Sequence, residues 1–166
     1  MLLYFPKQFD ANEWTILIGI LFNFLVFKLL PNRMSKEITP LICLLSISFP
    51  KVMDHTMAVK PFNLYDLTDS SKYELFDVAL YGVFPAFGFL FINIYEYFNL
   101  KGPKLVVYLV IWSFFSVGFE FLLVKLHVFV YTGWKLVFSL PIYIVVLSLT
   151  LLFYKFLIFY KNQENI

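Results

Sequence analysis

The stretch LVVYLVIWSFFSVGFEFLLV, from Leu105 to Val124, decides the fold of this chain. It contains one charged residue, Glu120, and lacks the alternation of apolar and polar residues that a membrane β-barrel strand requires. A helix of about 20 residues crosses the roughly 30 Å apolar core of a bilayer. Such a helix also pairs its own backbone groups where water is absent. The stretch therefore predicts a transmembrane helix.

Four other apolar stretches of the chain resemble this one and follow one another with short interruptions. The chain is 61% hydrophobic and only 14% charged, so too few polar residues are present to cover a water-facing surface. We therefore expect an all-α polytopic membrane protein, with a single five-helix transmembrane domain over residues 1–166. The expected spans are 14–30, 38–53, 76–95, 105–131 and 136–160, with a polar external loop at 54–72.

The distribution of basic residues predicts the orientation of these spans. An odd number of spans places the two ends of the chain on opposite sides of the membrane. With their flanks, the loops on the C-terminal side carry seven of the thirteen Lys and Arg residues. Because cytoplasmic loops carry the excess of these residues, the small bias predicts the N-terminus outside and the C-terminus inside. We expect a multi-pass protein of the cell membrane, with the lipid bilayer as its first partner.

Local signals predict where helices begin and break. Asp10 or Asn12 is placed to cap the first span, with Glu13 in the first turn. Proline removes a backbone hydrogen bond and clashes with the preceding turn. We therefore expect Pro50 to kink or end the second span and Pro85 to kink the third.

One stripe of small and polar residues on the first span predicts helix packing. Thr15, Gly19 and Asn23 recur at intervals of four residues and so share a face. Small residues let membrane helices approach closely, and polar residues form hydrogen bonds between them. A second interpretation is that the stripe lines a ligand site.

Glu120 is the sharpest candidate for function. A carboxylate within a span costs about 3 kcal/mol on insertion scales and usually faces a cavity or a partner. If the span is one helix, His127 and Tyr131 project from the same side as Glu120. Three roles stay open for Glu120: a structural hydrogen bond or ion pair, a ligand or ion site, and proton transfer. We expect its partner on another helix, with Lys135 and Asn23 as candidates.

Connectivity also brings several ionisable residues to the outer surface. Asp54 and His55 leave the second span, Asp77 enters the third and His127 leaves the fourth, all on one membrane side. We expect an outward-facing polar pocket there. Its expected ligand-binding residues are Asp54, His55, Asp77, Glu120 and His127, with Asn23, Glu74, Tyr81, Lys135 and Tyr143 in support.

The same residues leave the question of a metal open. Imidazole and carboxylate groups suit a divalent cation. The sequence nevertheless contains no HExxH motif and no clustered DxD pattern. Pairing between acids and lysines, which keeps the loop in water, is the favoured interpretation of these residues. The metal, if one binds, is unknown from sequence.

Other function classes find no support in the sequence. No cofactor is implied by any motif, because the glycines are scattered and no phosphate-binding loop or nucleophile elbow occurs. No catalytic residue is assigned. The basic residues are too few and too dispersed for binding to nucleic acid.

Several motifs resemble those of a known family. They are Asp54-His55-Thr56, Tyr65-Asp66, Lys72-Tyr73-Glu74 with Asp77, Tyr95-Glu96-Tyr97, Phe119-Glu120 and Gly133-Trp134-Lys135. With these motifs, nearly the whole chain is similar to a family of small uncharacterised multi-span membrane proteins from spore-forming Firmicutes. The shared features are a polar loop after the second span, acids entering the third and a Trp-Lys turn before the last. The resemblance implies no activity, so no functional residue is carried over.

We therefore expect an integral membrane protein whose pocket serves a small ligand or cation in sensing, passage or a membrane complex. One alternative is a membrane-embedded enzyme that acts on a lipid or isoprenoid, with Asp54, His55 and Glu120 as metal ligands or acid–base groups. Another is a structural subunit whose polar stripes meet partner helices, in a homo-oligomer or with another membrane protein. The positions of the acids distinguish these alternatives.

Overall fold

The first helix begins where the sequence predicts. The structure, a computed structural model, describes residues 5–6, 9–67 and 74–164. Asp10 is the N-cap of α1 (Ala11–Leu29) and forms a reciprocal capping box with Glu13. The Glu13 side chain accepts a hydrogen bond from the Asp10 amide at 2.9 Å. These bonds satisfy amides that a helix start leaves unpaired, so the predicted cap at Asp10 is confirmed.

Within the described residues, four helical segments are long and apolar enough to cross a membrane by length and composition. Two of them are single helices, α1 and α5 (Pro103–Lys125). The other two are composite, Leu75–Phe98 and Leu136–Gln163. The second composite segment consists of the short helix η2 (Leu136–Phe138) and most of α6 (Ser139–Glu164).

Leu75–Phe98 is broken at the predicted proline. It comprises α3 (Leu75–Leu80), the one-turn helix η1 (Tyr81–Val83) and α4 (Pro85–Phe98), with Pro85 in the first turn of α4. Proline is favoured in a first turn because its missing N–H has no partner there. The break expected at Pro85 is therefore confirmed.

The second expected span is longer than predicted. α2 (Ile38–Met57) has 20 residues and continues through Pro50, so of the kink or end expected there, the end is wrong. One proline removes a single ladder bond, which packing against a neighbouring helix can offset. Asp54 and His55, expected at the start of the external loop, lie in the last turns of α2. The end of that expected loop, 68–72, falls outside the described residues.

The fourth expected span is shorter than predicted. α5 ends at Lys125, and His127 has a left-handed backbone (φ 56°) that a helix does not continue through. The chain then forms the strand β2 (Phe129–Tyr131), which pairs antiparallel with β1 (Tyr65–Leu67). The prediction that Glu120, His127 and Tyr131 share one helix face is wrong, because the helix ends between them.

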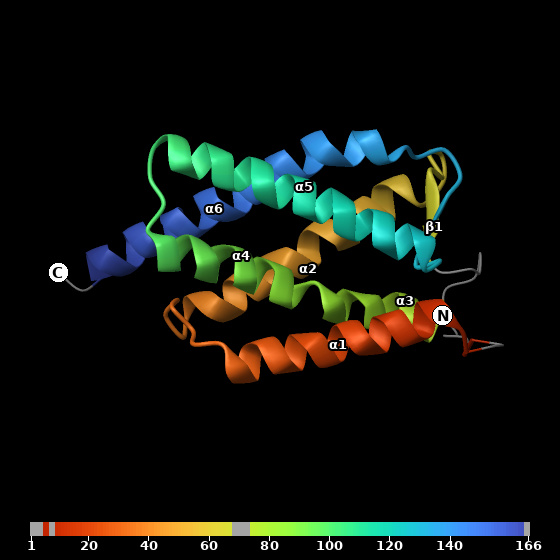
Figure 1. Ribbon diagram of the computed structural model, residues 1–166, viewed down its shortest axis with the longest axis horizontal. Helices are drawn as coiled ribbons and strands as arrows, with labels where there is room; N and C mark the ends of the chain where they lie inside the picture. Colours follow the sequence, from red (N-terminus) through yellow and green to blue (C-terminus); the bar gives the residue numbers. More distant parts are fainter. Residues whose placement is uncertain (1–4, 7–8, 68–73, 165–166) are drawn as a thin grey trace.

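The helices form an elongated bundle in which α1 begins and α6 ends at opposite ends (Figure 1). We call the end with β1 and β2 the ribbon end, and the end with the connections 30–37 and 99–102 the turn end. α1 packs against α3, η1 and α4, whereas α2 packs against α4 and α5 against α6. The predicted packing stripe on α1 is confirmed at Gly19, where an added Cβ would lie 2.9 Å from Val83 Cγ1.

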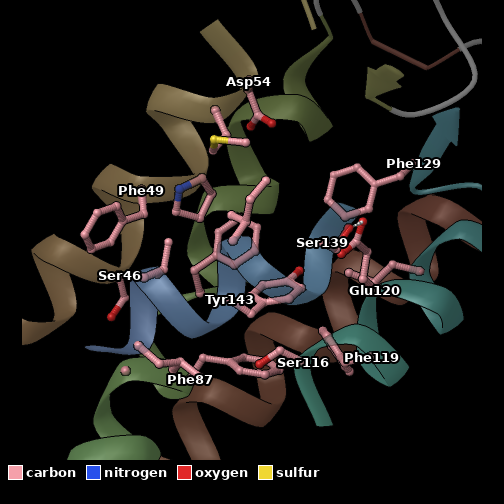
Figure 2. Close-up of a pocket in the computed structure, with 18 of the residues that line it drawn as sticks. Ser46, Phe49, Asp54, Phe87, Ser116, Phe119, Glu120, Phe129, Ser139 and Tyr143 are labelled. Atoms are coloured by element: carbon pink, nitrogen blue, oxygen red, sulfur yellow. Dashed lines mark hydrogen bonds between the residues drawn. The ribbon is translucent and has the colours of Figure 1, made fainter. Parts of the chain in front are cut away.

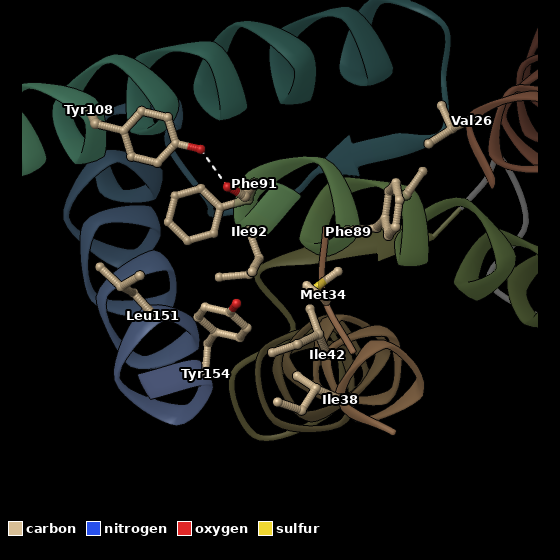
Figure 3. Close-up of a cluster of buried hydrophobic side chains, with 11 residues drawn as sticks. Val26, Met34, Ile38, Ile42, Phe89, Phe91, Ile92, Tyr108, Leu151 and Tyr154 are labelled. Atoms are coloured by element: carbon tan, nitrogen blue, oxygen red, sulfur yellow. Dashed lines mark hydrogen bonds between the residues drawn. The ribbon is translucent and has the colours of Figure 1, made fainter. Parts of the chain in front are cut away.

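Apolar side chains occupy both the inside and the outside of the bundle. Figure 3 shows one buried cluster in which Ile42, Phe91, Ile92 and Leu151 meet between α2, α4 and α6. Large apolar side chains also cover the outside of α1, α5 and α6, including Phe24, Ile111, Phe114 and Leu152, each about 60% exposed. A water-soluble protein rarely carries such extensive apolar surface. The outer surface is therefore of the kind that lipid covers.

Candidate ligand pocket

A cavity of about 200 Å³ lies among α2, α4, α5 and α6, on the inner side of the β-ribbon. Most of its wall is apolar and rich in aromatic rings. Figure 2 shows Phe49, Phe87, Phe119 and Phe129 around the same space. Further aromatic residues in the wall are Phe84, Phe91, Trp112 and Trp134. Two carboxylates, Asp54 and Glu120, also line the cavity.

The Asp54 carboxylate is held by two tyrosines. Tyr65 donates its hydroxyl proton to Asp54 Oδ1 at 2.7 Å, and Tyr81 donates to Oδ2 at 2.9 Å. Asp54 is only 7% exposed. Both oxygens thus accept a hydroxyl from a different element, one from β1 and one from η1. These bonds fix the rotamer of Asp54 against the pocket wall.

The Glu120 carboxylate is held by a second group of donors. Tyr131 donates to Glu120 Oε1, and Ser139 Oγ donates to the same oxygen at 2.8 Å. Trp134 Nε1 in turn donates to Ser139 Oγ at 3.0 Å. The Tyr143 hydroxyl also interacts electrostatically with Glu120. Two donors on Oε1 leave Oε2 as the oxygen that can accept from Tyr143 or from a ligand.

Neither expected partner of Glu120 is near it. Asn23 lies at the other side of the bundle, where it bonds to the backbone at Gly19, Val83 and Ala86. Lys135 is exposed. The expectation of Lys135 or Asn23 as partner is therefore wrong, because the hydroxyls of Tyr131 and Ser139 donate to Glu120 instead.

The β-ribbon connects the two carboxylates. Tyr65 and Tyr131 are direct cross-strand partners, so their side chains project from the same face of the ribbon. Burial, and then the charge of Asp54, raise the pKa of Tyr65 far above its usual value. Burial and the hydrogen bond to Glu120 raise the pKa of Tyr131 in the same way. Both tyrosines therefore remain proton donors to the carboxylates at neutral pH.

The remaining predicted site residues lie elsewhere. His55 is exposed, and its Nδ1 lies 2.9 Å from the Lys51 carbonyl oxygen of its own helix. His127 is exposed and lines a separate, shallow hollow with Lys125. Asp77 and Glu74 are buried at the start of α3, where they form a capping box. The structure thus brings Asp54, Glu120 and Tyr143 together at the cavity, with Tyr81 in support.

The sequence prediction misses several pocket residues, namely Tyr65 in the ribbon and Trp134 and Ser139 beyond it. None of these three residues lies on the same helix as Asp54 or Glu120, so no helix-face pattern connects them to the carboxylates. Among the described residues, no group of three His, Cys, Asp or Glu side chains is arranged to hold a metal ion. Comparison of the chain with family models, curated proteins and solved structures finds no significant match. The function must therefore be argued from the pocket itself.

Proposed function

We propose that this chain is an integral membrane protein that binds a small amphiphilic ligand in the pocket at Asp54 and Glu120. The observation that carries the proposal is the composition of the wall: an apolar, aromatic cavity with two buried carboxylates. Ligand sites are concave and mostly apolar, with a few polar groups that fix orientation. An engineered cavity of about 150 Å³ holds benzene. A space of about 200 Å³ therefore suits a ligand somewhat larger than a single ring.

The position of His55 favours binding over the alternative of a membrane enzyme. A metal-dependent or acid–base mechanism with Asp54, His55 and Glu120 requires the imidazole to face the carboxylates. His55 instead points away from the cavity and bonds back to its own helix. Asp54 and Glu120 are held by hydroxyl donors, as expected for groups that orient a ligand.

We infer that the protein crosses the cell membrane five times. Four crossings are the apolar segments described above, and α2 is the fifth. α2 lies alongside α4 within the bundle and is about as long as α1, 20 against 19 residues. Its acidic and basic residues, Lys51, Asp54 and His55, lie near the ribbon end. With the N-terminus outside, the ribbon faces the cell exterior and the pocket lies just beneath it.

Tryptophan fluorescence tests the proposed function. Trp112 and Trp134 line the cavity, whereas Trp14 is 58% exposed on α1. In the Trp14→Phe protein, reconstituted in nanodiscs, we expect bromobenzene to quench the emission saturably, because its bromine reaches both rings. Val146→Phe should abolish the saturable quenching by filling the cavity.

The neighbouring substitution Val145→Phe is the matched control. Val145 is 56% exposed and does not line the pocket, so this variant should retain the saturable quenching. Quenching that rises linearly with probe in all three proteins reports partition into lipid. That result would contradict a ligand site in this cavity.

A further inference from the structure

The charged groups that line the pocket are all of one sign. Asp54 and Glu120 are both in the wall, and among the described residues no Lys, Arg or His lines the cavity. Within the residues that the structure describes, neither Asp54 nor Glu120 forms a salt bridge. Two basic side chains lie outside the cavity: Lys51 lies over the Tyr81 ring, and His55 is exposed on the same helix as Asp54. The pocket therefore carries an uncompensated preference for positive charge.

The aromatic wall favours the same kind of ligand. The faces of aromatic rings attract cations, and this attraction increases where water is excluded. Rings from several elements surround the space, among them Phe87 and Phe119, whose centroids are 4.7 Å apart, and Phe91 and Trp112, at 5.7 Å. Aromatic cages of this type recognise quaternary ammonium groups, which have no proton to donate.

The hydrogen bonds of the pocket wall do not favour an anionic or a neutral ligand. The serine and threonine hydroxyls deeper in the wall donate to carbonyls of their own helices: Ser46 to Ile42, Ser116 to Trp112 and Thr150 to Val146. An anionic ligand would thus meet carboxylates and hydroxyl groups whose protons are already donated. A neutral ligand would gain apolar contact without using the two charges.

We propose that the pocket binds lipophilic organic cations, with an ammonium group beside Glu120 and an apolar body among the phenylalanine rings. This inference rests on the proposed function and names the ligand class of the same site. Glu120 is the proposed partner of the ammonium group, since the Tyr131 and Ser139 hydroxyls both donate to Oε1 and leave Oε2 for the cation and for Tyr143. Asp54 extends the negative potential toward the ribbon.

A pair of isosteric probes tests the inference. One is para-bromobenzyltrimethylammonium, and the other is para-bromoneopentylbenzene, in which carbon replaces the nitrogen and the charge is lost. Both carry the same bromine, so both quench Trp112 and Trp134 in the Trp14→Phe protein. In nanodiscs of uncharged lipid, and after correction for partition, we expect the cation to bind at least about tenfold more tightly.

Substitutions identify the source of that preference. Glu120→Gln keeps the shape and should reduce affinity for the cation by about tenfold while leaving the neutral probe unchanged. Asp54→Asn should act in the same direction, and it supplies an independent test if Glu120→Gln impairs folding. Glu96→Gln is the control, because Glu96 lies in α4 but outside the cavity.

The outcomes separate the two proposals. Saturable binding of both probes with equal affinity, or a cation preference that survives both Glu120→Gln and Asp54→Asn, overturns the inference and leaves the proposed pocket standing. If neither probe binds saturably, both the inference and the proposed function are overturned. Preference for the cation that is lost in the Glu120→Gln protein and kept in the Glu96→Gln protein supports both.

Discussion

Asn23 shows how a single side chain connects two helices inside the bundle. Its Nδ2 donates to the carbonyls of Gly19 at 2.9 Å and Val83 at 2.8 Å, and its Oδ1 accepts from the Ala86 amide at 2.7 Å. Val83 and Ala86 flank the break at Pro85, where regular helix bonding is interrupted. A backbone group left unpaired in an apolar interior is costly. Asn23 supplies the missing bonds from a neighbouring helix.

Asn23→Ala should therefore destabilise the protein by about 1–2 kcal/mol, because two backbone groups lose their partner. The measurement is unfolding in detergent micelles, followed by circular dichroism. Asn162→Ala is the control, since Asn162 is exposed on α6. Equal stability of the two variants would show that Asn23 does not support the break.

At the level of single residues, the sequence predicts the acids of the pocket and two supporting tyrosines, Tyr81 and Tyr143, but misses Tyr65 and Ser139. Asp54 and Glu120 stand out because ionisable residues in apolar runs are rare and functional. His55 follows Asp54 directly, yet consecutive residues on a helix point about 100° apart, so one faces the cavity and the other does not. Tyr65 reaches Asp54 only through the position of the β-ribbon, which depends on pairing with residues 129–131. No local pattern contains that information.

At the level of elements, the sequence predicts helices well and their ends less well. Pro85 breaks its segment because the chain there already turns through η1, whereas α2 passes through Pro50 while packed against α4. After Leu126 the chain carries His-Val-Phe-Val-Tyr, whose β-branched and aromatic residues are typical of a strand. The predicted span 105–131 includes these residues as the end of an apolar helix, so it misses that change. The β-ribbon is therefore absent from the prediction.

The contact between α2 and α4 depends on a glycine. A Cβ at Gly88 would lie 1.8 Å from Ser46 Oγ, so Gly88→Ala should destabilise the protein by about 1–3 kcal/mol through overpacking. Ser46→Ala removes the clashing oxygen, and the double variant should recover most of the loss in thermal stability. Gly118→Ala provides the matched control, because nothing lies within 4 Å of its added Cβ.

An ion pair joins α2 to α6 at the turn end. Lys161 Nζ lies 2.7 Å from Glu37 Oε2. The bond to Lys161 lowers the pKa of Glu37 from 4.5 to about 2. A lowered folded-state pKa gives stability that is fully present above pH 4.5 and is lost as pH falls toward about 2. Glu37 is largely exposed, so the contribution is small and screened by salt.

Comparison of wild type with Glu37→Gln tests this linkage. The difference in melting temperature should be largest above pH 4.5, shrink between pH 4.5 and about 2, and decrease at high salt. Lys161→Met should show the same pH dependence, and the double variant should add nothing to it. A difference that is constant with pH would contradict a role for the Glu37 charge.

At the scale of the whole molecule, the two ends of the bundle differ in structure. The ribbon end carries paired strands over the pocket, and the turn end carries short connections, with Arg33 packed on the Tyr97 ring at 4.5 Å. The proposed orientation places the ribbon outside the cell. Length and hydropathy alone predict the bundle, but the small excess of basic residues at one end leaves the orientation to experiment.

Cysteine labelling tests the orientation. Cys43 is the only cysteine, so Cys43→Ala provides a background for single-cysteine variants. A membrane-impermeant maleimide should label Phe62→Cys, near the ribbon end, in intact cells. It should label Lys101→Cys, at the turn end, only after the membrane is opened. Both side chains are exposed, so accessibility of the site itself is matched. The reverse pattern would invert the topology.

The cross-strand pairing of Tyr65 with Tyr131 has a mechanical consequence. A molecule that displaces Tyr131 from Glu120 pulls on a strand whose partner holds Asp54, so neither carboxylate is disturbed alone. Under the proposed function, a ligand that displaces Tyr131 would therefore move both strands together. The six paired residues would carry that movement from the cavity to the ribbon end of the bundle.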